Sequence, residues 1–431
     1  MLPAAGIRPA ASGLSGKINP WRPGAPPLIL RNVRRGAGNT FGMRELDLGA
    51  PPAGVSARGD GSPGSPDRTA GVDNMTQDAR KIVIIGAGIA GLCTAVCARK
   101  CGYDIELIEM HDGAGGLATS WRRGDYTFET CLHWLLGSNP DSTMYAHWRE
   151  VFDIGKLTFV YPEEFVRLES EHGESVSVYT NPDLLESEMC SKAPRDAAEV
   201  ARFTSAVRRF ATLELPDAAE SRPRRWLTML RAAPYLPMLR RWSRVNCEEY
   251  GKRFTHPLLR SFFGGGQLGN LSALALIFSL AWMSRQNAGY AIGGSQAIIR
   301  LIMERFLSLG GRLRLGTGVE RILVEHGTAI GVQLSSGETI NADWVISAAD
   351  GHATIYEMLA GKYKDESIDT TFRTLRVFPS YLQVSVGVAR DLSQWPGYLT
   401  RRLDTTIEVD PETRLREVSF RIFHFDPTFA P

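Results

Sequence analysis

The chain has 431 residues, of which 43% are hydrophobic and 22% charged, a composition typical of globular proteins. This length is enough for two or three packed units. The formal net charge of +2 provides no broad basic surface, so we expect no nucleic-acid partner. The six cysteines show neither a disulfide framework nor a metal-ligand spacing, and we expect no metal site.

The sequence contains no apolar run of about 18 residues, the length that spans a bilayer. The longest candidate, residues 271–283, includes two serines and is expected to form a core helix. Met1 is followed by proline, glycine and alanine rather than by a charged segment and an apolar core, so we predict no signal peptide. These features favour a cytoplasmic protein.

Residues 1–74 differ in composition from the rest of the chain, because they hold 13 glycines and 10 prolines. Such a composition without a period predicts disorder. We interpret the segment as a leader and Met75 as the working start. Its nine basic residues leave an organelle transit peptide as the alternative, although five acidic residues are unusual for one.

Residues 81–109 have the pattern of a βαβ dinucleotide-binding unit. An apolar run over residues 81–85 is typical of a buried parallel strand, a helix is expected through Lys100, and a second strand over residues 104–109. Between the first strand and the helix stands a G-x-G-x-x-G motif formed by Gly86, Ala87, Gly88, Ile89, Ala90 and Gly91. Its glycines permit, in order, a tight turn, the approach of a pyrophosphate and close packing of helix on strand. The helix N-terminus then offers N–H groups to the phosphates.

Two features after the second strand favour FAD. Glu109 stands 23 residues after Gly86, where a carboxylate accepts hydrogen bonds from ribose hydroxyls and repels the 2′-phosphate of NADP. The double glycine Gly115–Gly116 follows after five intervening residues. This pattern resembles the extended FAD fingerprint of glutathione-reductase-like and amine-oxidase-like flavoproteins, in which the chain returns under the pyrophosphate. A plain surface turn is the alternative for the double glycine. We predict further FAD contacts from Met110, Leu117, Ala118 and Thr119.

Further segments resemble the phytoene desaturase family, which includes carotenoid isomerases and retinol saturases. They are GGLATSW (115–121), GDYTFE (124–129), HWLLGSNP (133–140), AGYAIGGSQ (288–296), LGG (309–311) with VERI (319–322), and WVISAAD (344–350). The resemblance covers residues 81–431. It implies an α/β fold with a Rossmann-like FAD-binding domain of the glutathione-reductase/amine-oxidase type and an inserted α+β substrate domain. It also implies FAD contacts from Gly293, Gly294, Val319 and Ala348.

The expected domain organisation has five segments. They are a leader (1–74), a first part of the FAD-binding domain (78–150), a substrate domain (151–285), a second FAD-binding part (286–375) and a return to the substrate domain (376–431). In the inserted region, residues 157–179 alternate as strands do, and residues 196–213 have the spacing of an amphipathic helix.

The chain departs from the resembled family in two places. Leu117 stands where many relatives have an arginine that contacts the phosphates, so the phosphate charge rests on backbone N–H groups and the helix dipole. The chain also ends at Pro431 without the glycine-rich segment that closes over the flavin in the family. We interpret this end as a C-terminal truncation.

Residues 222–244 carry seven arginines and no acidic residue, interleaved with tryptophan, leucine and methionine. Pro234 and Pro237 divide the segment into two short helices. One interpretation is a peripheral membrane contact, in which basic side chains meet anionic headgroups and apolar ones enter the interface. The other is a pair of core helices with a solvated basic face.

The function predicted from these patterns is an FAD-dependent oxidoreductase that transfers hydride between the flavin and a hydrophobic polyene or isoprenoid, in desaturation, saturation or isomerisation. Because the flavin carries the chemistry, no catalytic dyad is required. His133 and Trp134 are candidate catalytic residues, with a structural histidine as the alternative, and Tyr290 is a candidate for lining the pocket. The alternative functions are an amine-oxidase-like flavoenzyme with an aromatic cage and a truncated, non-catalytic flavoprotein.

Overall fold

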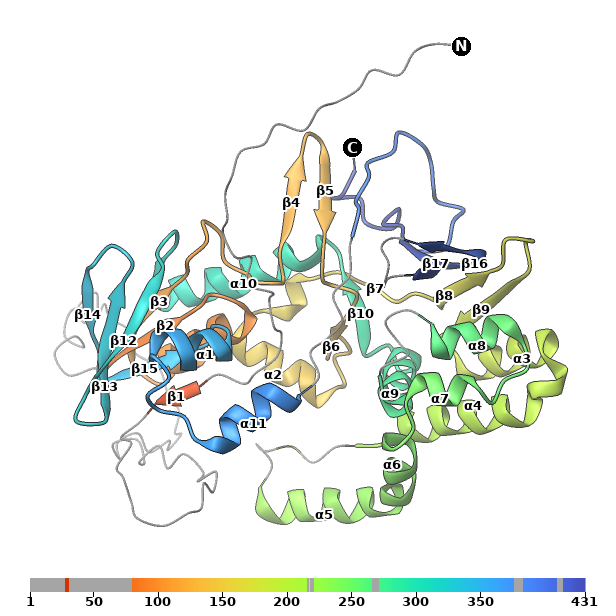
Figure 1. Ribbon diagram of the computed structural model, residues 1–431, viewed down its shortest axis with the longest axis horizontal. Coiled ribbons are helices and arrows are strands. Elements are labelled where there is room, and N and C mark those ends of the chain that lie inside the picture. Colours follow the sequence, from red (N-terminus) through yellow and green to blue (C-terminus); the bar gives the residue numbers. More distant parts are fainter. Residues whose placement is uncertain are drawn as a thin grey trace, which may run out of the picture.

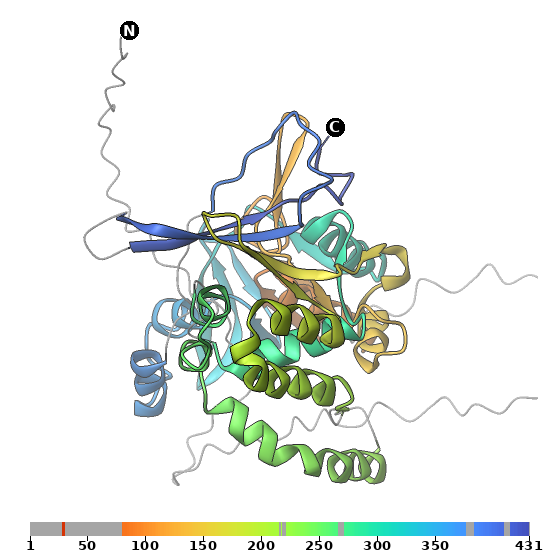
Figure 2. The same ribbon diagram turned by 90° about the vertical axis from the view of Figure 1, so that its right-hand side faces the viewer.

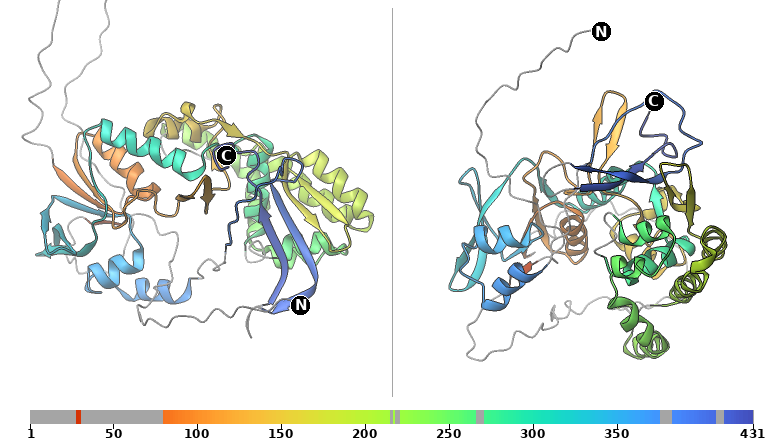
Figure 3. Two further views of the ribbon diagram at one scale, coloured as in Figure 1. Left: turned by 90° about the horizontal axis from the view of Figure 1, so that it is seen from above. Right: turned by 45° about the vertical axis from the view of Figure 1, so that its right-hand side comes forward.

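A computed structural model describes residues 80–214, 217, 221–265, 271–375, 383–408 and 414–430, and the backbone of Leu28–Leu30. The described elements form two parts that lie side by side (Figure 1). The first is built around a five-stranded, mainly parallel sheet, and the second around a four-stranded sheet with a group of helices beneath it (Figure 3). This is the α/β architecture that the sequence predicts.

The five-stranded sheet contains the expected βαβ unit. In spatial order its strands are β1 (Leu28–Leu30), β15 (Trp344–Ser347), β2 (Lys81–Ile85), β3 (Asp104–Ile108) and β11 (Arg312–Arg314). Strands β15, β2, β3 and β11 run parallel, so the predicted strands at 81–85 and 104–109 and the predicted return at 344–350 are confirmed. Strand β1 pairs antiparallel with β15 and lies within the expected leader, where no sequence pattern indicated a strand. The remainder of that leader lies outside the described residues.

Both faces of this sheet are covered, which explains the unbroken apolar run of β2. Successive side chains of a strand point to opposite faces. Ile82 and Ile84 pack against α1 (Ile89–Lys100) and α10 (Gly294–Ser308). Val83 and Ile85 pack against a three-stranded antiparallel sheet. Its strands are β12 (Val319–Glu325), β13 (Thr328–Leu334) and β14 (Thr339–Asn341).

Short elements connect the two parts. A hairpin and a small three-stranded sheet of order β6-β10-β7 lie between them in Figure 1. The strands are β4 (Ser120–Arg123), β5 (Tyr126–Glu129), β6 (Leu135–Leu136), β7 (Phe159–Val160) and β10 (Ala288–Ala291). Besides α1 and α10, the helical elements outside the second part are α2 (Thr143–Val151), η1 (Ile154–Lys156), the π-helical turn η4 (Ala353–Met358) and α11 (Glu366–Thr374).

The second part combines a sheet of order β17-β16-β8-β9 with a helical layer. Its strands are β8 (Glu164–Glu169), β9 (Ser175–Tyr179), β16 (Tyr398–Glu408) and β17 (Arg414–Arg421). Because β16 pairs parallel with β8, residues near the end of the chain complete a sheet that begins in the inserted region. Its helices are α3 (Pro182–Lys192), η2 (Pro194–Asp196), α4 (Ala197–Ala211), α5 (Arg222–Ala232), η3 (Ala233–Tyr235), α6 (Leu236–Ser243), α7 (Cys247–Gly251), α8 (Pro257–Gly264) and α9 (Ala273–Ser284). The strands and the amphipathic helix predicted in this region are confirmed.

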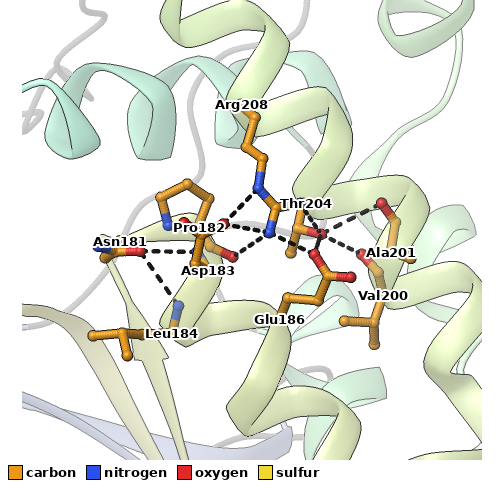
Figure 4. Close-up of polar contacts among 9 residues, drawn as sticks. All are labelled: Asn181, Pro182, Asp183, Leu184, Glu186, Val200, Ala201, Thr204 and Arg208. Carbon is orange, nitrogen blue, oxygen red and sulfur yellow. Dashed lines mark hydrogen bonds and ion pairs between the residues drawn. The ribbon is translucent and has the colours of Figure 1, made fainter.

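Helices α3 and α4 are joined by a polar network (Figure 4). A guanidinium nitrogen of Arg208 lies 2.7 Å from Asp183 and 2.6 Å from Glu186, and the Thr204 hydroxyl donates to Glu186 at 2.8 Å. Asn181 caps α3 by accepting the Asp183 N–H at 2.8 Å. These contacts hold together the two helices that pack beneath β8 and β9.

Helix α9 lies in the core of the second part, as predicted for residues 271–283. Leu276, Ile277 and Leu280 are each at most 2% exposed and pack with residues of α4 and α8. Within the described ranges, no helix combines the length and the apolar character needed to cross a membrane.

Candidate functional site

The turn between β2 and α1 holds two glycines that the protein's own backbone requires. Gly86 has φ +94°, in the left-handed region that favours glycine. A Cβ at Gly91 would lie 1.9 Å from the Gly86 carbonyl oxygen and 3.3 Å from the Ala348 side chain. These two positions therefore account for the tight turn and for the close packing of α1 against the sheet.

Gly88 is different, because the protein leaves room for a side chain there. Its φ of −69° suits any L-residue, and a Cβ would meet no protein atom of the structure closer than the Gly115 carbonyl oxygen at 3.9 Å. The space lies at the N-terminus of α1, whose first turn carries no acidic residue and no side-chain cap. The first N–H groups of a helix lack intrahelical acceptors and favour an anion. The missing side chain thus keeps open the place where a pyrophosphate would approach.

The double glycine passes directly beside this turn. The Gly115 N–H donates to the Ala87 carbonyl at 2.9 Å, and Gly88 and Gly115 form a parallel bridge. Gly116 has φ +61°, and a Cβ there would lie 3.2 Å from the Gly88 α-carbon. Two distant glycine motifs therefore form one backbone surface. Several residues predicted to contact FAD along this stretch are exposed in the structure: Met110, Gly116, Leu117 and Thr119, whereas Ala118 is half-buried.

Glu109 lies at the end of β3 with its carboxylate buried. One oxygen accepts the Ala87 N–H at 2.7 Å, and the other accepts the His111 N–H at 3.0 Å. Each carboxylate oxygen has a second lone pair, so both can still accept a hydroxyl donor. The Thr317 N–H donates to the Glu109 carbonyl at 2.8 Å, which brings the residues before Val319 to the same end of the sheet.

The structure brings most predicted cofactor contacts to one end of the five-stranded sheet. The Ala348 N–H donates to the Ile85 carbonyl at 2.8 Å, and its backbone borders Gly86. Val319 begins β12 and packs under the sheet. The turn residues Gly86, Ala87, Gly88, Ile89, Ala90 and Gly91 thus share this end with Glu109, Gly115, Val319 and Ala348.

Gly293 and Gly294 lie at the start of α10 and are linked to this end through that helix. Both have left-handed φ values, +86° and +60°. The side chain of Ile299, further along α10, lies 3.5 Å from the position of a Cβ at Gly115, and Gln296 donates to the Ser120 carbonyl at 2.6 Å. Helix α10 therefore runs along the segment that follows the double glycine.

Two acidic residues that the sequence did not single out hold the start of α10. The buried Glu129 carboxylate accepts the Ser295 N–H and the Ser295 hydroxyl, both at 2.7 Å, and Asp426 accepts the Gly293 N–H at 2.8 Å. Glu129 belongs to the GDYTFE segment, so the family resemblance pointed to its neighbourhood without giving it a role. No local signal marked Asp426, because its partner lies 133 residues away.

His133 and Trp134 lie where the two parts meet. Their rings are 5.8 Å apart, and Trp134 lies 6.0 Å from the Phe165 ring on β8. The His133 side chain is exposed, although the protein around it disfavours its charged form. Burial, and secondarily the Arg421 guanidinium, lower the pKa of His133 to about 4. At neutral pH His133 is therefore an uncharged imidazole that can donate or accept one hydrogen bond at each ring nitrogen.

Tyr290 does not line an open surface. It is 2% exposed and packs against the rings of Phe423 and Phe425 at 5.9 and 5.1 Å. Burial, followed by the carboxylates of Asp426 and Glu129, raises the pKa of its phenol. The expectation that Tyr290 faces the pocket is not met, because β10 is a central strand whose side chains are all buried.

The arrangement fits FAD. The open space at Gly88 and the adjoining Gly115–Gly116 backbone suit a pyrophosphate, and Glu109 offers carboxylate oxygens for a ribose. Leu117 is exposed and, being uncharged, contributes no cation to the phosphates, so backbone N–H groups and the α1 dipole would neutralise them.

The chain is similar to several known proteins. The chain is 26% identical over 326 residues to a phytoene desaturase (neurosporene-forming) of Rhodobacter capsulatus, covering 71% of this chain and 60% of that one. It is 28% identical over 293 residues to a phytoene desaturase (lycopene-forming) of Pseudescherichia vulneris, covering 66% and 58%. The chain thus spans about 60% of the length of these curated relatives. A solved oxidoreductase from Methanosarcina mazei is 20% identical with a TM-score of 0.42, covering 68% of this chain and 64% of that one.

The family profile described as "flavin containing amine oxidoreductase" matches residues 89–354, more than half of the chain. This match spans α1, the double glycine, α10 and β15, which are the elements around the Gly88 space. FAD is accordingly the cofactor, and the chain belongs to the flavin containing amine oxidoreductase family.

Proposed function

We propose that the protein is an FAD-dependent oxidoreductase of the phytoene desaturase type, acting on a hydrophobic polyene or isoprenoid. The observation that carries the cofactor assignment is the open space at Gly88, bordered by Gly115 and by the N-terminus of α1. The names of the relatives support the substrate class, since both reported proteins are phytoene desaturases. The class covers desaturation, saturation and isomerisation.

The residues of the chain would have the following roles in binding and orientation. The Gly88 and Gly115–Gly116 backbone would bind the phosphates, and Glu109 the ribose. Bound FAD supplies a centre that accepts or returns a hydride. His133, uncharged because burial lowers its pKa to about 4, would orient a group through a hydrogen bond rather than by its charge. Trp134 and Phe165 would offer apolar ring surface beside it.

We infer a domain division that follows from this assignment. Residues 78–150 and 286–375 would form the FAD-binding domain, and residues 151–285 and 376–431 the substrate domain. The pairing of β16 with β8 supports the joining of the last two segments, because one continuous sheet contains both. The aromatic contact between Trp134 and Phe165 lies at the border of these domains.

A second proposal concerns helices α5 and α6, which we assign to a membrane surface. Helix α5 lies at the edge of the molecule (Figure 2), and Thr228 is its one buried residue. Trp226 is 66% exposed, and Met229 and Leu230 are 51% and 52% exposed. A short helix with little buried surface is only marginally stable in water. Its exposed apolar side chains therefore favour a partner surface that covers them. The seven arginines of 222–244 indicate that the partner is anionic.

The membrane proposal is tested by vesicle co-sedimentation of the full chain. We expect binding to vesicles containing anionic phospholipid and little binding to purely zwitterionic ones. Replacing Arg224, Arg225 and Arg231 by glutamate should weaken this binding at least tenfold, since each basic residue near an anionic surface contributes about 1 kcal/mol. As a control, Arg149→Glu with Arg300→Glu changes exposed arginines on α2 and α10 and should leave binding unchanged. Equal binding by both variants would contradict the proposal.

The proposed function is tested by flavin reduction and reoxidation in the FAD-loaded chain. Under anaerobic conditions, polyenes and isoprenoids should change the flavin absorbance of the oxidised or the prereduced protein, and primary and secondary amines should not. Reduction by amines alone would favour an amine-oxidase-like enzyme. A fully loaded protein whose flavin responds to neither class would support the non-catalytic alternative and would overturn the proposal.

A further inference from the structure

One face of β17 carries polar side chains toward the helices of the second part. Glu417, Ser419 and Arg421 alternate along the strand and therefore share a face. The Ser261 hydroxyl of α8 donates to Glu417 at 2.9 Å, which shows that this face turns toward the helical layer. Ser419 pairs with the Thr400 hydroxyl of β16 at 2.9 Å. The last residue of the row, Arg421, lies nearest to His133.

The Arg421 guanidinium is enclosed by aromatic rings. Its central carbon lies 5.2 Å from the centre of the Tyr398 ring and 5.8 Å from that of Phe423. One terminal nitrogen donates to the His133 carbonyl at 3.4 Å, a long contact. The Nε atom is buried and has no hydrogen-bond partner within the described part of the chain. A guanidinium has five N–H donors, and among the described residues one of those of Arg421 has an acceptor.

No carboxylate in the described ranges compensates this charge. The titratable groups beside the guanidinium are the phenols of Tyr398 and Tyr290 rather than carboxylates, and burial lowers the pKa of Arg421. Glu417, on the same face, is bonded to Ser261, and burial raises the pKa of its carboxyl. Asp426 already accepts the Gly293 N–H. Burial of a charge without a partner is unfavourable, so a site that retains one implies a ligand that completes it.

Other arginines of the chain show what Arg421 lacks. Arg312 holds the Asp104 carboxylate through two nitrogens, both at 2.8 Å. Arg401, on the adjacent strand, donates to Glu169 at 2.8 Å. Arginine presents its donors as a planar fork that matches the two oxygens of a carboxylate. The Nε atom of Arg421 has no such acceptor among the described residues, and a terminal nitrogen of the same fork contacts the His133 carbonyl.

An apolar row leads to this cation. The rings of Trp134, Phe165 and Tyr398 follow one another at 6.0 and 6.5 Å, and the Arg421 guanidinium lies against the last of them. Phe165 is 7% exposed and belongs to the core, whereas Trp134 and Tyr398 are half-buried and keep accessible ring surface. Accessible aromatic rings beside a cation are complementary to an amphipathic molecule with an anionic end. A pure hydrocarbon would leave the cation uncompensated.

We propose that Arg421 binds the carboxylate of the substrate, so that the protein acts on a polyenoic or isoprenoid carboxylic acid whose chain lies beside the half-buried rings of Trp134 and Tyr398. This inference rests on the proposed function and narrows its substrate class from hydrocarbons to acids. Arg421 serves as a specificity residue, while the redox chemistry stays with the flavin.

The test compares two probes with one chain and different ends, all-trans-retinoic acid and all-trans-retinol, bound to the FAD-loaded full chain. We expect the acid to bind at least tenfold more tightly, since hydrogen bonds to a charged group contribute about 1.5–3 kcal/mol and about 1.4 kcal/mol is tenfold. Arg421→Met should abolish the preference, and Arg421→Lys should retain part of it. Arg401→Met removes an arginine that is paired with Glu169 and should leave the preference unchanged.

Three results would overturn the inference. They are equal binding of acid and alcohol, an acid preference that survives in Arg421→Met, and a preference for the alcohol over the acid. If the preference survives and Arg421→Met loses FAD affinity, Arg421 serves the cofactor. If Arg421→Met fails to fold, the wild-type protein tests the proposal, because the preference must vanish as the pH falls below the acid's own pKa. Flavin reduction by polyenes without an acid preference overturns this inference alone, and an acid preference without any flavin response overturns the proposed function alone.

Discussion

A Cβ at Gly91 would lie 1.9 Å from the carbonyl oxygen of Gly86, so α1 packs on β2 at a distance that excludes any side chain. The glycine between these two, Gly88, has no such neighbour and is at least 3.9 Å from the nearest protein atom at its Cβ position. Gly86 and Gly91 therefore serve the fold, whereas we propose that Gly88 serves a ligand.

Alanine substitutions should separate these two roles by their effect on stability. Gly91→Ala should lower the free energy of unfolding of the cofactor-free protein by about 2 kcal/mol or more, because the methyl group forces the backbone apart. Gly88→Ala should change it by no more than about 0.5 kcal/mol, because its φ suits alanine and the lower entropy of the unfolded chain offsets the weaker N-cap preference of alanine. Urea denaturation followed by circular dichroism measures both changes.

The matched control is Gly113→Ala, in the loop just before the double glycine. Gly113 has no protein atom of the structure within 4 Å of its Cβ position and no left-handed φ. The substitution should leave stability within about 0.5 kcal/mol of the wild-type value. A Gly91→Ala protein as stable as Gly113→Ala would show that α1 and β2 are not packed as described.

The FAD-binding part could be predicted well from the sequence, because the residues that identify it lie close together in the chain. The strand, turn, helix and acidic residue from Lys81 to Glu109 follow one another in the chain, and each is a part of the same dinucleotide-binding motif. The resemblance also predicted the return of β15 to the sheet, which needs no knowledge of side-chain contacts.

What the sequence did not indicate depends on pairs of residues far apart. The bond from Gly293 to Asp426 and the position of Arg421 beside His133 arise only when β17 folds back, across 133 and 288 residues respectively. Arg421 stands in a strand with ordinary alternation, so no local pattern distinguishes it from exposed arginines. Tyr290 was expected to be accessible, but β10 became a central strand with both neighbours paired.

Glu109→Gln should weaken FAD binding by at least tenfold. The substitution removes a negative acceptor for the ribose hydroxyls, and hydrogen bonds to charged groups contribute about 1.5–3 kcal/mol each. It also places an amide where Glu109 accepts the Ala87 N–H at 2.7 Å. Fluorescence titration with FAD measures the change. The exposed Asp112→Asn removes the same charge nearby and should bind FAD as the wild type does.

Glu129→Ala should strongly destabilise the protein. The buried Glu129 carboxylate accepts three backbone N–H groups at 3.1–3.2 Å, from Thr130 to Leu132, besides its two bonds to Ser295. Its loss leaves buried donors unsatisfied, and we expect a decrease of about 3 kcal/mol or more in the free energy of unfolding. Ser295→Ala removes one of the two Ser295 bonds and should have a smaller effect. Equal effects would contradict a role of Glu129 in joining its own segment to α10.

His133 should titrate far below an ordinary histidine. Burial and Arg421 lower its pKa from 6.5 to about 4, so the unfolded chain binds more protons between these values. The stability that His133 contributes is therefore complete above pH 6.5 and is lost as the pH falls toward 4. NMR titration, with the signal assigned by His133→Asn, measures this pKa. In Arg421→Met the pKa of His133 should rise only in part, because burial is the larger cause of its lowering. A His133 pKa near 6.5 in the wild-type protein would contradict the described surroundings.

The most direct test of the cofactor site is an equilibrium titration of FAD into the full chain and its Gly88→Ala variant. We predict that the wild type binds one FAD per chain and that Gly88→Ala, although as stable as the wild type without cofactor, binds at least a hundredfold more weakly, because its methyl group occupies the space at the N-terminus of α1. Equal affinities of the two proteins, or no FAD binding by the folded wild type, would contradict the account.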